Sequence, residues 1–323
     1  MTPIATSILV ISSLYVLNLL LPIHATAKKI ARFVLTKSFY NGFNQLADKL
    51  MKERSDQLLA DFHGERFLCQ NNHGSSIDAT YVPSYAVNKT GNVVVICLNT
   101  TYQDHHPRHW QPLIENGADV LLWNPTRKTP VNFADDLTAL LQKLRTEKPT
   151  QVIAVKSYCA SADPAIAAVD RMEDPNIHQI IDRGHGNAQK LARSITLFAG
   201  LGFVKEVIQE EFDCHGIDRI HRIQGRSLFM TPHLGDQVMN CGATNLTKEL
   251  FEQTRGQTII ELDRHDHWSK WDHVAYDQVL TFLSEIGVVK SDFTSTASER
   301  FPSIEAPGCF KRSCIPILIK TCV

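Results

Sequence analysis

A serine at position 157 stands where an apolar, β-branched stretch meets an alanine-rich stretch, in the sequence QVIAVKSYCASADPAIAAV over residues 151–169. A serine hydroxyl is a weak nucleophile at neutral pH, so it needs an imidazole to accept its proton and a carboxylate to orient that imidazole. An aspartate and a histidine follow two later apolar stretches, at Asp236 and His267. The chain order serine, aspartate, histidine therefore predicts acyl transfer by a catalytic triad.

Two histidines compete for the role of the base in this triad. They are His265 and His267, in the stretch DRHDHW over residues 263–268. His265 lies nearer the preceding apolar run, whereas His267 is followed by Trp268, which would give the imidazole a partly apolar wall. We favour His267 as the base and keep His265 as the alternative.

Acyl transfer also needs donors for the oxyanion of the tetrahedral intermediate, and backbone N–H groups commonly supply them. One donor is expected from Tyr158, because it follows the expected nucleophile. The other is expected from Thr100 or Thr101, which follow the apolar run NVVVICL over residues 92–98. Each donor contributes on the order of 3 kcal/mol to transition-state stabilisation.

The same histidines allow a second kind of chemistry, because the H-x-H spacing of His265 and His267 is found among metal ligands in hydrolases. His105, His106 and His109 lie in another loop and add to the set. No H-E-x-x-H motif or matched carboxylate accompanies them, so a metallohydrolase is the less favoured reading. The triad mechanism requires no metal and no organic cofactor, and we expect none.

Apolar runs alternate with helical patterns along most of the chain, and this alternation predicts a doubly wound, mostly parallel α/β sheet with helices on both faces. The carboxyl ends of parallel strands meet at one edge, where sites of such sheets form. Strands are predicted over residues 92–98, 118–124, 151–156, 177–182, 227–232 and 257–263, and helices over residues 132–148, 161–170 and 274–287.

At this point the chain resembles the α/β-hydrolase superfamily, over roughly residues 65–287. The resemblance rests on ERFLCQNNHGSSIDATYVP as an opening hairpin, SLFMTPHLGDQVM as the acid-bearing strand and loop, and TIIELDRHDHW as the histidine-bearing one. It implies a serine esterase or lipase-like enzyme of the α/β-hydrolase type, with a helical cap excursion over residues 184–222. The segment IIDRGHG is similar to bacterial membrane-linked and secreted-effector members, in which an aspartate-arginine pair follows the sixth strand.

The sequence departs from the family pattern at the nucleophile elbow. Where the family has G-x-S-x-G, this chain has Val155, Lys156, Ser157, Tyr158 and Cys159. Side chains two residues before and after the serine approach each other in that turn, so a β-branched Val155 should crowd it. Either small neighbours relax the turn, or the chain is a catalytically impaired binding protein that retains the hydrolase scaffold.

The amino-terminal region carries no charged residue from Thr2 to Ala27, and the mostly apolar span Ile4–Ile23 has the length of about 20 residues that crosses a bilayer. Lys28, Lys29 and Arg32 follow at once, which predicts a membrane anchor with the rest of the chain on the cytoplasmic side. The alternatives are a cleaved signal peptide, which would give a secreted protein, and a helix buried in the protein.

The remaining composition sets limits on partners. A net charge of -1 from 33 basic and 34 acidic residues, without a basic-aromatic patch, argues against nucleic acid as a partner. The sequence gives no indication of the oligomeric state. The predicted organisation is a hydrophobic anchor or signal segment over 1–27, an amphipathic helical connector over 28–60, a hydrolase-like domain over 61–289, and a linker with a cysteine-containing, apolar-basic tail over 290–323.

These features together predict a membrane-associated serine hydrolase that cleaves a carboxylic ester or thioester. The substrate is expected to be a small-molecule or lipid ester, because the apolar amino-terminal segment and a helical cap both suit an acyl group.

Overall fold

One central sheet organises the chain. The computed structural model describes residues 24–33, 56, 59–97, 110–126, 129–184, 187–195, 202–232, 257–262, 271 and 273–290. Its strands are β1 (Glu65–Arg66), β2 (Cys69–Gln70), β3 (Ser76–Val82), β4 (Val93–Cys97), β5 (Asp119–Asn124), β6 (Ile153–Tyr158), β7 (Ile177–Asp182), β8 (Ser227–Pro232) and β9 (Gln257–Leu262).

The strand order is β1-β3-β5-β4-β6-β7-β8-β9, and β2 pairs with β3. The pairs from β5 through β9 are parallel, whereas β3 runs antiparallel to β5 and β1 antiparallel to β3. The carboxyl ends of β4, β6, β7, β8 and β9 therefore lie at the same edge of the sheet.

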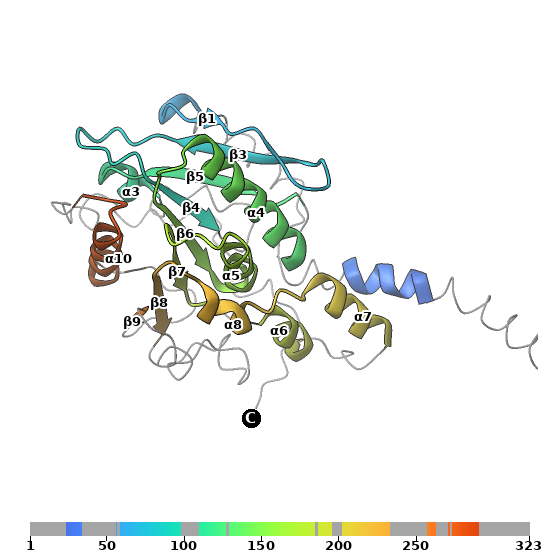
Figure 1. Cartoon of the computed structure of the whole chain (residues 1–323). Coiled ribbons are helices and arrows are strands. Elements are labelled where there is room, and N and C mark those ends of the chain that lie inside the picture. The colour runs from blue at the N-terminus through green and yellow to red at the C-terminus, as the bar shows by residue number, and fades with distance from the viewer. Residues whose placement is uncertain are drawn as a thin grey trace, which may run out of the picture.

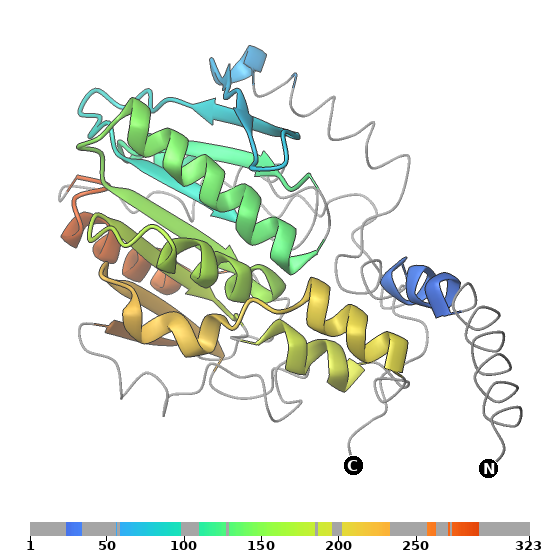
Figure 2. The ribbon, with the colours of Figure 1, turned by 45° about the vertical axis from the view of Figure 1, so that its right-hand side comes forward.

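Helices cover both faces of this sheet (Figure 1). Figure 2 shows α4 and α5 on the near face and α10 behind the sheet. The helices are α3 (Gln111–Glu115), α4 (Pro130–Glu147), α5 (Ala162–Asp170), α6 (Ala188–Ile195), α7 (Gly202–Glu211), α8 (Gly216–Arg219) and α10 (His273–Glu285), with 3-10 turns at Cys159–Ser161 and Ile220–Arg222. A further helix spans residues 24–33 and is called helix 24–33 below.

Alternation of side chains along each strand builds two apolar cores. In β4, Val94 and Ile96 pack with α3 and α10, whereas Val93 and Val95 pack with α4 and α5. All four are essentially inaccessible to water. A strand that is apolar on both sides in this way must be central in the sheet, as its continuous run of apolar residues indicates.

Helix α4 shows how local sequence fixes an element against the sheet. Thr129 precedes it in extended conformation, and its hydroxyl oxygen accepts the Asn132 N–H at 3.3 Å. Pro130 follows at the first helical position, where its missing N–H has no consequence. The face that carries Phe133, Leu137, Leu140, Leu141 and Leu144 is then fully buried.

The fold class expected from the sequence is confirmed, because the sheet is mostly parallel, both faces are covered by helices, and a helical excursion separates β7 from β8. The largest difference is at β6, which runs two residues further than expected. None of the helices in the described part of the chain has the length and hydropathy needed to cross a membrane. The predicted anchor Ile4–Ile23 and the tail over 291–323 lie outside the described residues, as does most of the 28–60 connector.

We predict that Gly225→Ala destabilises the fold by about 1–3 kcal/mol or more, because the added methyl would overlap backbone that cannot move freely. A Cβ at Gly225 would fall on the carbonyl group of Ile177, where β7 begins, and 3.3 Å from the Cα of His178. The midpoint of urea unfolding measures the effect.

Gly202→Ala is the matched control, since a Cβ at Gly202 meets no heavy atom within 4 Å. It should change the unfolding free energy by no more than about 0.5 kcal/mol. Equal midpoints for the two variants would contradict the close approach at Gly225.

Candidate active site

The sharp turn between β6 and α5 is centred on Cys159. This residue follows the last residue of β6 and has a left-handed backbone, with φ of 51°. A non-glycine residue pays a conformational cost for that geometry, which is found where a side chain must be presented at a functional site. A strand-to-helix turn of this kind is the geometry that exposes the nucleophile in α/β-hydrolases.

Ser157 does not occupy this turn, which corrects the expectation from the sequence. It lies inside β6, paired with Cys97 of β4 on one side and Ile181 of β7 on the other. Its side chain is buried, at 1% exposure, and its Oγ lies 3.4 Å from the carbonyl oxygen of Ile180. The turn therefore comes two residues later than expected, because β6 continues through Tyr158.

Once the turn is centred on Cys159, the residues two before and two after it are both small, namely Ser157 and Ser161. Val155 is four residues before the turn and packs in the core against α4 and α5, so the crowding expected from it does not arise. Residues 157–161 have the pattern S-x-C-x-S, with a cysteine where the family pattern has serine. This pattern is the sequence signal for the position of the turn.

Ser161 also fixes the shape of the turn. Its hydroxyl oxygen accepts the Tyr158 N–H at 3.0 Å. The same oxygen lies 2.7 Å from the carbonyl oxygen of Cys97 and 2.8 Å from that of Tyr158, and can donate its proton to either. The turn is thus tied to the end of β4.

The Tyr158 N–H points to Ser161 and is not directed at a substrate, so the expected oxyanion role of Tyr158 is not supported by this geometry. The residue after Cys159 is Ala160, in the first 3-10 turn. The first N–H groups of a helix have no acceptor within the helix, and they are suited to bind a developing negative charge.

The other predicted site residues lie outside the described part of the chain. These are Asp236, His265, His267, Thr100 and Thr101, together with the metal-ligand candidates His105, His106 and His109. The strands before them end at Cys97, Pro232 and Leu262, at the same edge of the sheet as Tyr158. Among the described residues, no group of three or more histidine, cysteine or acidic side chains could hold a metal ion.

A buried ion pair closes the end of β7 beside the turn. Arg183 has a left-handed backbone and folds back on Asp182, with Nε 2.8 Å from one carboxylate oxygen and an Nη 3.0 Å from the other. Trp271 donates its indole N–H to the same carboxylate at 2.9 Å. The two charged side chains are each 5% exposed.

Two cations stack on aromatic rings at this edge. The Lys156 ammonium lies 4.0 Å from the centre of the Trp271 ring, and the Arg183 guanidinium lies 5.0 Å from that of Tyr158. Trp271 precedes α10 and follows the stretch that contains both candidate histidines. The Asp182 carboxylate thereby holds Trp271 at the end of β7.

Apolar residues of the cap cover Cys159, which is 7% exposed. It belongs to a cluster formed mainly by α6 and α7, whose other members are Ala31, Ala160, Ala188, Ala192, Val204, Val207, Ile208 and Phe212. The surroundings of the thiol are therefore those that an acyl chain or another apolar group would contact.

Asp163 holds the cap to the helix that follows the turn. Its buried carboxylate accepts the Ala188 N–H at the start of α6, at 2.7 Å, and the Gly216 N–H at the start of α8. Only glycine fits at position 216, because a Cβ there would be 2.7 Å from the backbone oxygen of Asp163. Burial raises the pKa of the Asp163 carboxyl to about 7, against the effect of the two N–H donors.

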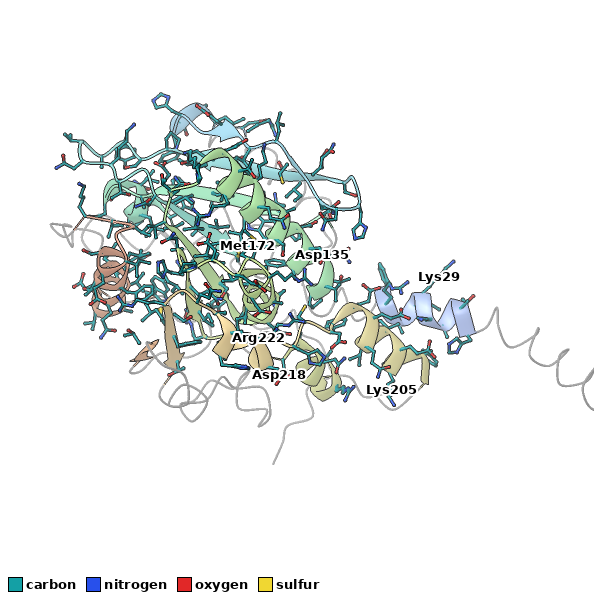
Figure 3. All side chains as sticks on the ribbon, viewed as in Figure 1. Lys29, Asp135, Met172, Lys205, Asp218 and Arg222 are labelled. Atoms are coloured by element: carbon teal, nitrogen blue, oxygen red, sulfur yellow. The ribbon has the colours of Figure 1, made fainter. Side chains whose placement is uncertain are left out.

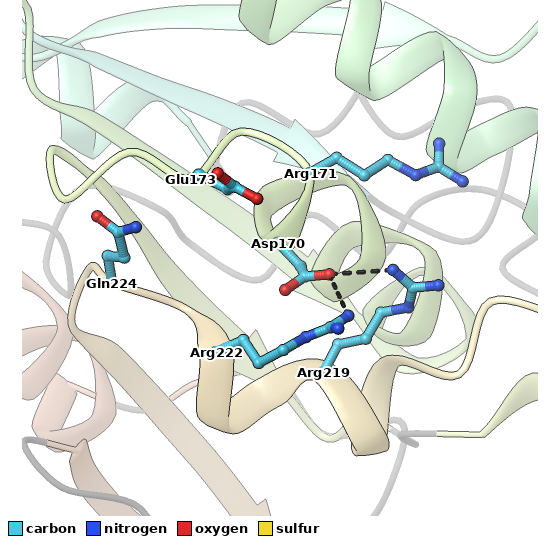
Figure 4. Close-up of a pocket in the computed structure, with 6 residues that line it drawn as sticks. All are labelled: Asp170, Arg171, Glu173, Arg219, Arg222 and Gln224. Carbon is cyan, nitrogen blue, oxygen red and sulfur yellow. Dashed lines mark hydrogen bonds and ion pairs between the residues drawn. The ribbon is translucent and has the colours of Figure 1, made fainter.

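A hollow at the opposite end of α5 has a different character (Figure 4). There the carboxylate of Asp170 pairs with Arg219 at 3.0 Å and with Arg222 at 2.6 Å. Asp170 is the last residue of α5, whereas the turn at Cys159 precedes its first residue. The ion pairs in this hollow thus connect α5 to the α8 region. The hollow is separate from the candidate active site.

We predict that the stability of Asp163→Asn depends less on pH than that of the parent. The folded-state pKa of about 7 lies above the ordinary value of 3.8, so the folded parent holds an extra proton between these pH values. Binding of this extra proton stabilises the fold fully at low pH, and the stabilisation is lost as the pH rises through 7. Between pH 5 and pH 8 the loss amounts to about 2–3 kcal/mol.

Urea unfolding of both proteins at pH 5 and pH 8 measures the difference. Asp218→Asn, which removes a carboxylate from the exposed side of α8, is the matched control. If the parent and Asp163→Asn lose the same stability between the two pH values, the buried carboxylate does not titrate as described.

We further predict that Asp182→Ala destabilises the fold by about 3–5 kcal/mol, because the buried guanidinium of Arg183 loses its carboxylate. The double variant Asp182→Ala with Arg183→Met should be less destabilised than the single one. Thermal unfolding of the three proteins tests this order, and a double variant that is less stable than Asp182→Ala would refute it.

Comparison with known proteins supports the architecture. No family model and no curated protein sequence matches this chain. Among solved structures, the fold is similar to an acetyl xylan esterase from Paenibacillus sp. R4, with a TM-score of 0.52 and 14% identity over 73% of this chain and 92% of that one. It is also similar to an alpha/beta hydrolase from Penicillium sp. sh18, with a TM-score of 0.53 and 13% identity over 69% and 97% of the two chains. The described part of this chain therefore has the fold of the α/β-hydrolase superfamily.

Proposed function

We propose that this protein hydrolyses carboxylic esters or thioesters, and that Cys159 is its nucleophile in place of Ser157. The observation that carries the proposal is the left-handed backbone of Cys159 at the turn from β6 to α5, with small residues two positions away on both sides. Hydrolases with solved structures of the same fold support the reaction class. In this proposal His267, or alternatively His265, is the base, and Asp236 orients it.

The reaction follows from these roles. The imidazole takes the thiol proton of Cys159, and the thiolate sulfur attacks the carbonyl carbon of the substrate. The oxyanion that forms is stabilised by the Ala160 N–H and by a backbone N–H of Thr100 or Thr101. The imidazolium then gives its proton to the leaving alcohol or thiol, and water hydrolyses the thioester on Cys159 to release the acid and restore the thiol.

The apolar cluster around Cys159 supports an acyl group of low polarity as the substrate portion that is bound. A lipid ester or thioester meets this requirement. Membrane association through Ile4–Ile23, with the folded domain on the cytoplasmic side, is part of the proposal because the span is uncharged and lysines follow it. A secreted form after signal cleavage is the alternative location.

The proposal is tested by labelling the purified full chain with an iodoacetamide probe and mapping the labelled cysteines by mass spectrometry. Among the four buried thiols, those of Cys69, Cys97, Cys159 and Cys214, that of Cys159 should be alkylated fastest, because an activated thiolate reacts ahead of buried structural thiols. The matched control is Cys214→Ser, which removes a buried thiol outside the turn, at 2% exposure. This control should leave both the label on Cys159 and hydrolysis of p-nitrophenyl esters unchanged.

Substitutions at the two candidate nucleophiles give the decisive comparison. Cys159→Ala should lower ester hydrolysis by a factor of about 10³ or more, since removal of a nucleophile has effects of this size. Cys159→Ser should gain reactivity with a fluorophosphonate probe, while Ser157→Ala should keep activity within a few-fold. A fluorophosphonate label on the parent that disappears in Ser157→Ala would overturn the assignment to Cys159. Folded protein with no activity and no selective label would favour a binding role for the scaffold.

A further inference from the structure

Helix 24–33 lies alongside the cap helix α7, as both ribbon views show (Figures 1 and 2). The basic side chains of Lys28 and Arg32 face the glutamates of α7. The Lys28 ammonium lies 2.5 Å from Glu210 and 3.2 Å from Glu206, and the Arg32 guanidinium lies 2.6 Å from Glu211. The carboxylates of Glu210 and Glu206 raise the pKa of Lys28, so this side chain stays charged.

Further contacts extend this interface along the helix. His24 lies one turn before Lys28, with its Nε2 3.3 Å from Glu206 and its ring edge-on to that of Phe203. Ala31 is buried in the cluster that also contains Cys159 and residues of α6 and α7. Helix 24–33 is therefore packed on the cap close to the candidate nucleophile.

The opposite face of helix 24–33 is turned to the outside. Ile30 is 59% exposed and Phe33 is 56% exposed, and these two apolar residues are three positions apart, on one side of the helix. Figure 3 shows Lys29 on the side away from α7. Helix 24–33 thus carries partly exposed ion pairs to α7 on one side and exposed apolar residues on the other.

The sequence immediately before this helix identifies what covers the apolar face. Ile4–Ile23 carries no charged residue and ends where helix 24–33 begins. A segment of about 20 apolar residues is long enough to enter a bilayer, and an exposed apolar face directly after it would then lie at the bilayer surface.

We infer that helix 24–33 rests on a lipid bilayer through Ile30 and Phe33 while its basic face holds the cap helix α7, so that the cap over Cys159 is placed at the membrane surface. The consequence for substrate class rests on the proposed function: the acyl group that is cleaved comes from a lipid in that bilayer. The bilayer contact itself depends on no catalytic residue.

The charge distribution sets the kind of bilayer. The basic side chains that face α7 are already paired with glutamates, so apolar insertion rather than attraction to anionic headgroups holds the outer face. Vesicles of zwitterionic phosphatidylcholine should therefore be sufficient. Anionic lipid should strengthen the contact by no more than about five-fold, because one basic side chain of helix 24–33, that of Lys29, lies on the outer side.

The contact is tested with the full chain reconstituted into phosphatidylcholine vesicles that carry bromine atoms on their acyl chains. Ile30→Trp should add tryptophan fluorescence that the brominated lipid quenches more than it quenches the parent protein. Val87→Trp is the control, because Val87 is 99% exposed and is far from helix 24–33 in sequence. Equal quenching of the added fluorescence in the two variants would overturn the bilayer contact.

The link from this helix to the cap is tested by charge reversal. Lys28→Glu with Arg32→Glu should loosen α7 and speed alkylation of Cys159 several-fold, as measured on the Cys159 peptide by mass spectrometry. Adding Glu206→Lys, Glu210→Lys and Glu211→Lys restores opposite charges and should return the rate toward that of the parent. An unchanged rate in the first variant would refute the link. Absence of the added quenching would contradict the bilayer contact. Failure of the proposed enzyme function would instead appear only as missing ester hydrolysis.

Discussion

A left-handed backbone is costly at a residue that has a side chain. The turn at Cys159 persists because the elements before and after it fix the path of the chain. The strand before it is held in the middle of a parallel sheet, and the helix after it must pack against α4. Ser161 bridges the turn to the end of β4 with a single oxygen atom. The position of the thiol is thus dictated by two large apolar layers and one hydroxyl.

Buried charge performs a second task in this molecule, which is to join segments that are distant in the chain. Asp182 connects the end of β7 to Trp271, and Asp163 connects α5 to two helices of the excursion. Each carboxyl group is buried, so loss of its partners would leave a desolvated polar or charged group. Such contacts define one arrangement of the loops more sharply than apolar packing alone, because a hydrogen bond has a direction and a hydrophobic contact does not.

Much of the architecture was predictable from local sequence, because continuous β-branched runs such as residues 93–97 can only be central strands and residues 132–147 repeat at the helical period. The end of β6 was not, since Lys156 and Ser157 are polar and give no sign that they are buried in a strand. The position of the turn depends on that end, so the turn was expected two residues too early in the chain. The partners of Asp163 and the contact of Asp182 with Trp271 could not be predicted either, because these groups come from parts of the chain that are distant in sequence.

The contacts of Asp163 also affect which changes in the length of the excursion this protein can tolerate during evolution. The excursion that carries α6 and α7 leaves near Ala188 and returns at Gly216, and both ends attach to the same carboxylate. Lengthening a loop whose ends are already fixed adds little entropy cost, since that cost grows only with the logarithm of loop length. Insertions or deletions between those two points can therefore reshape the apolar surface of α6 and α7 while the geometry at residue 159 is left intact.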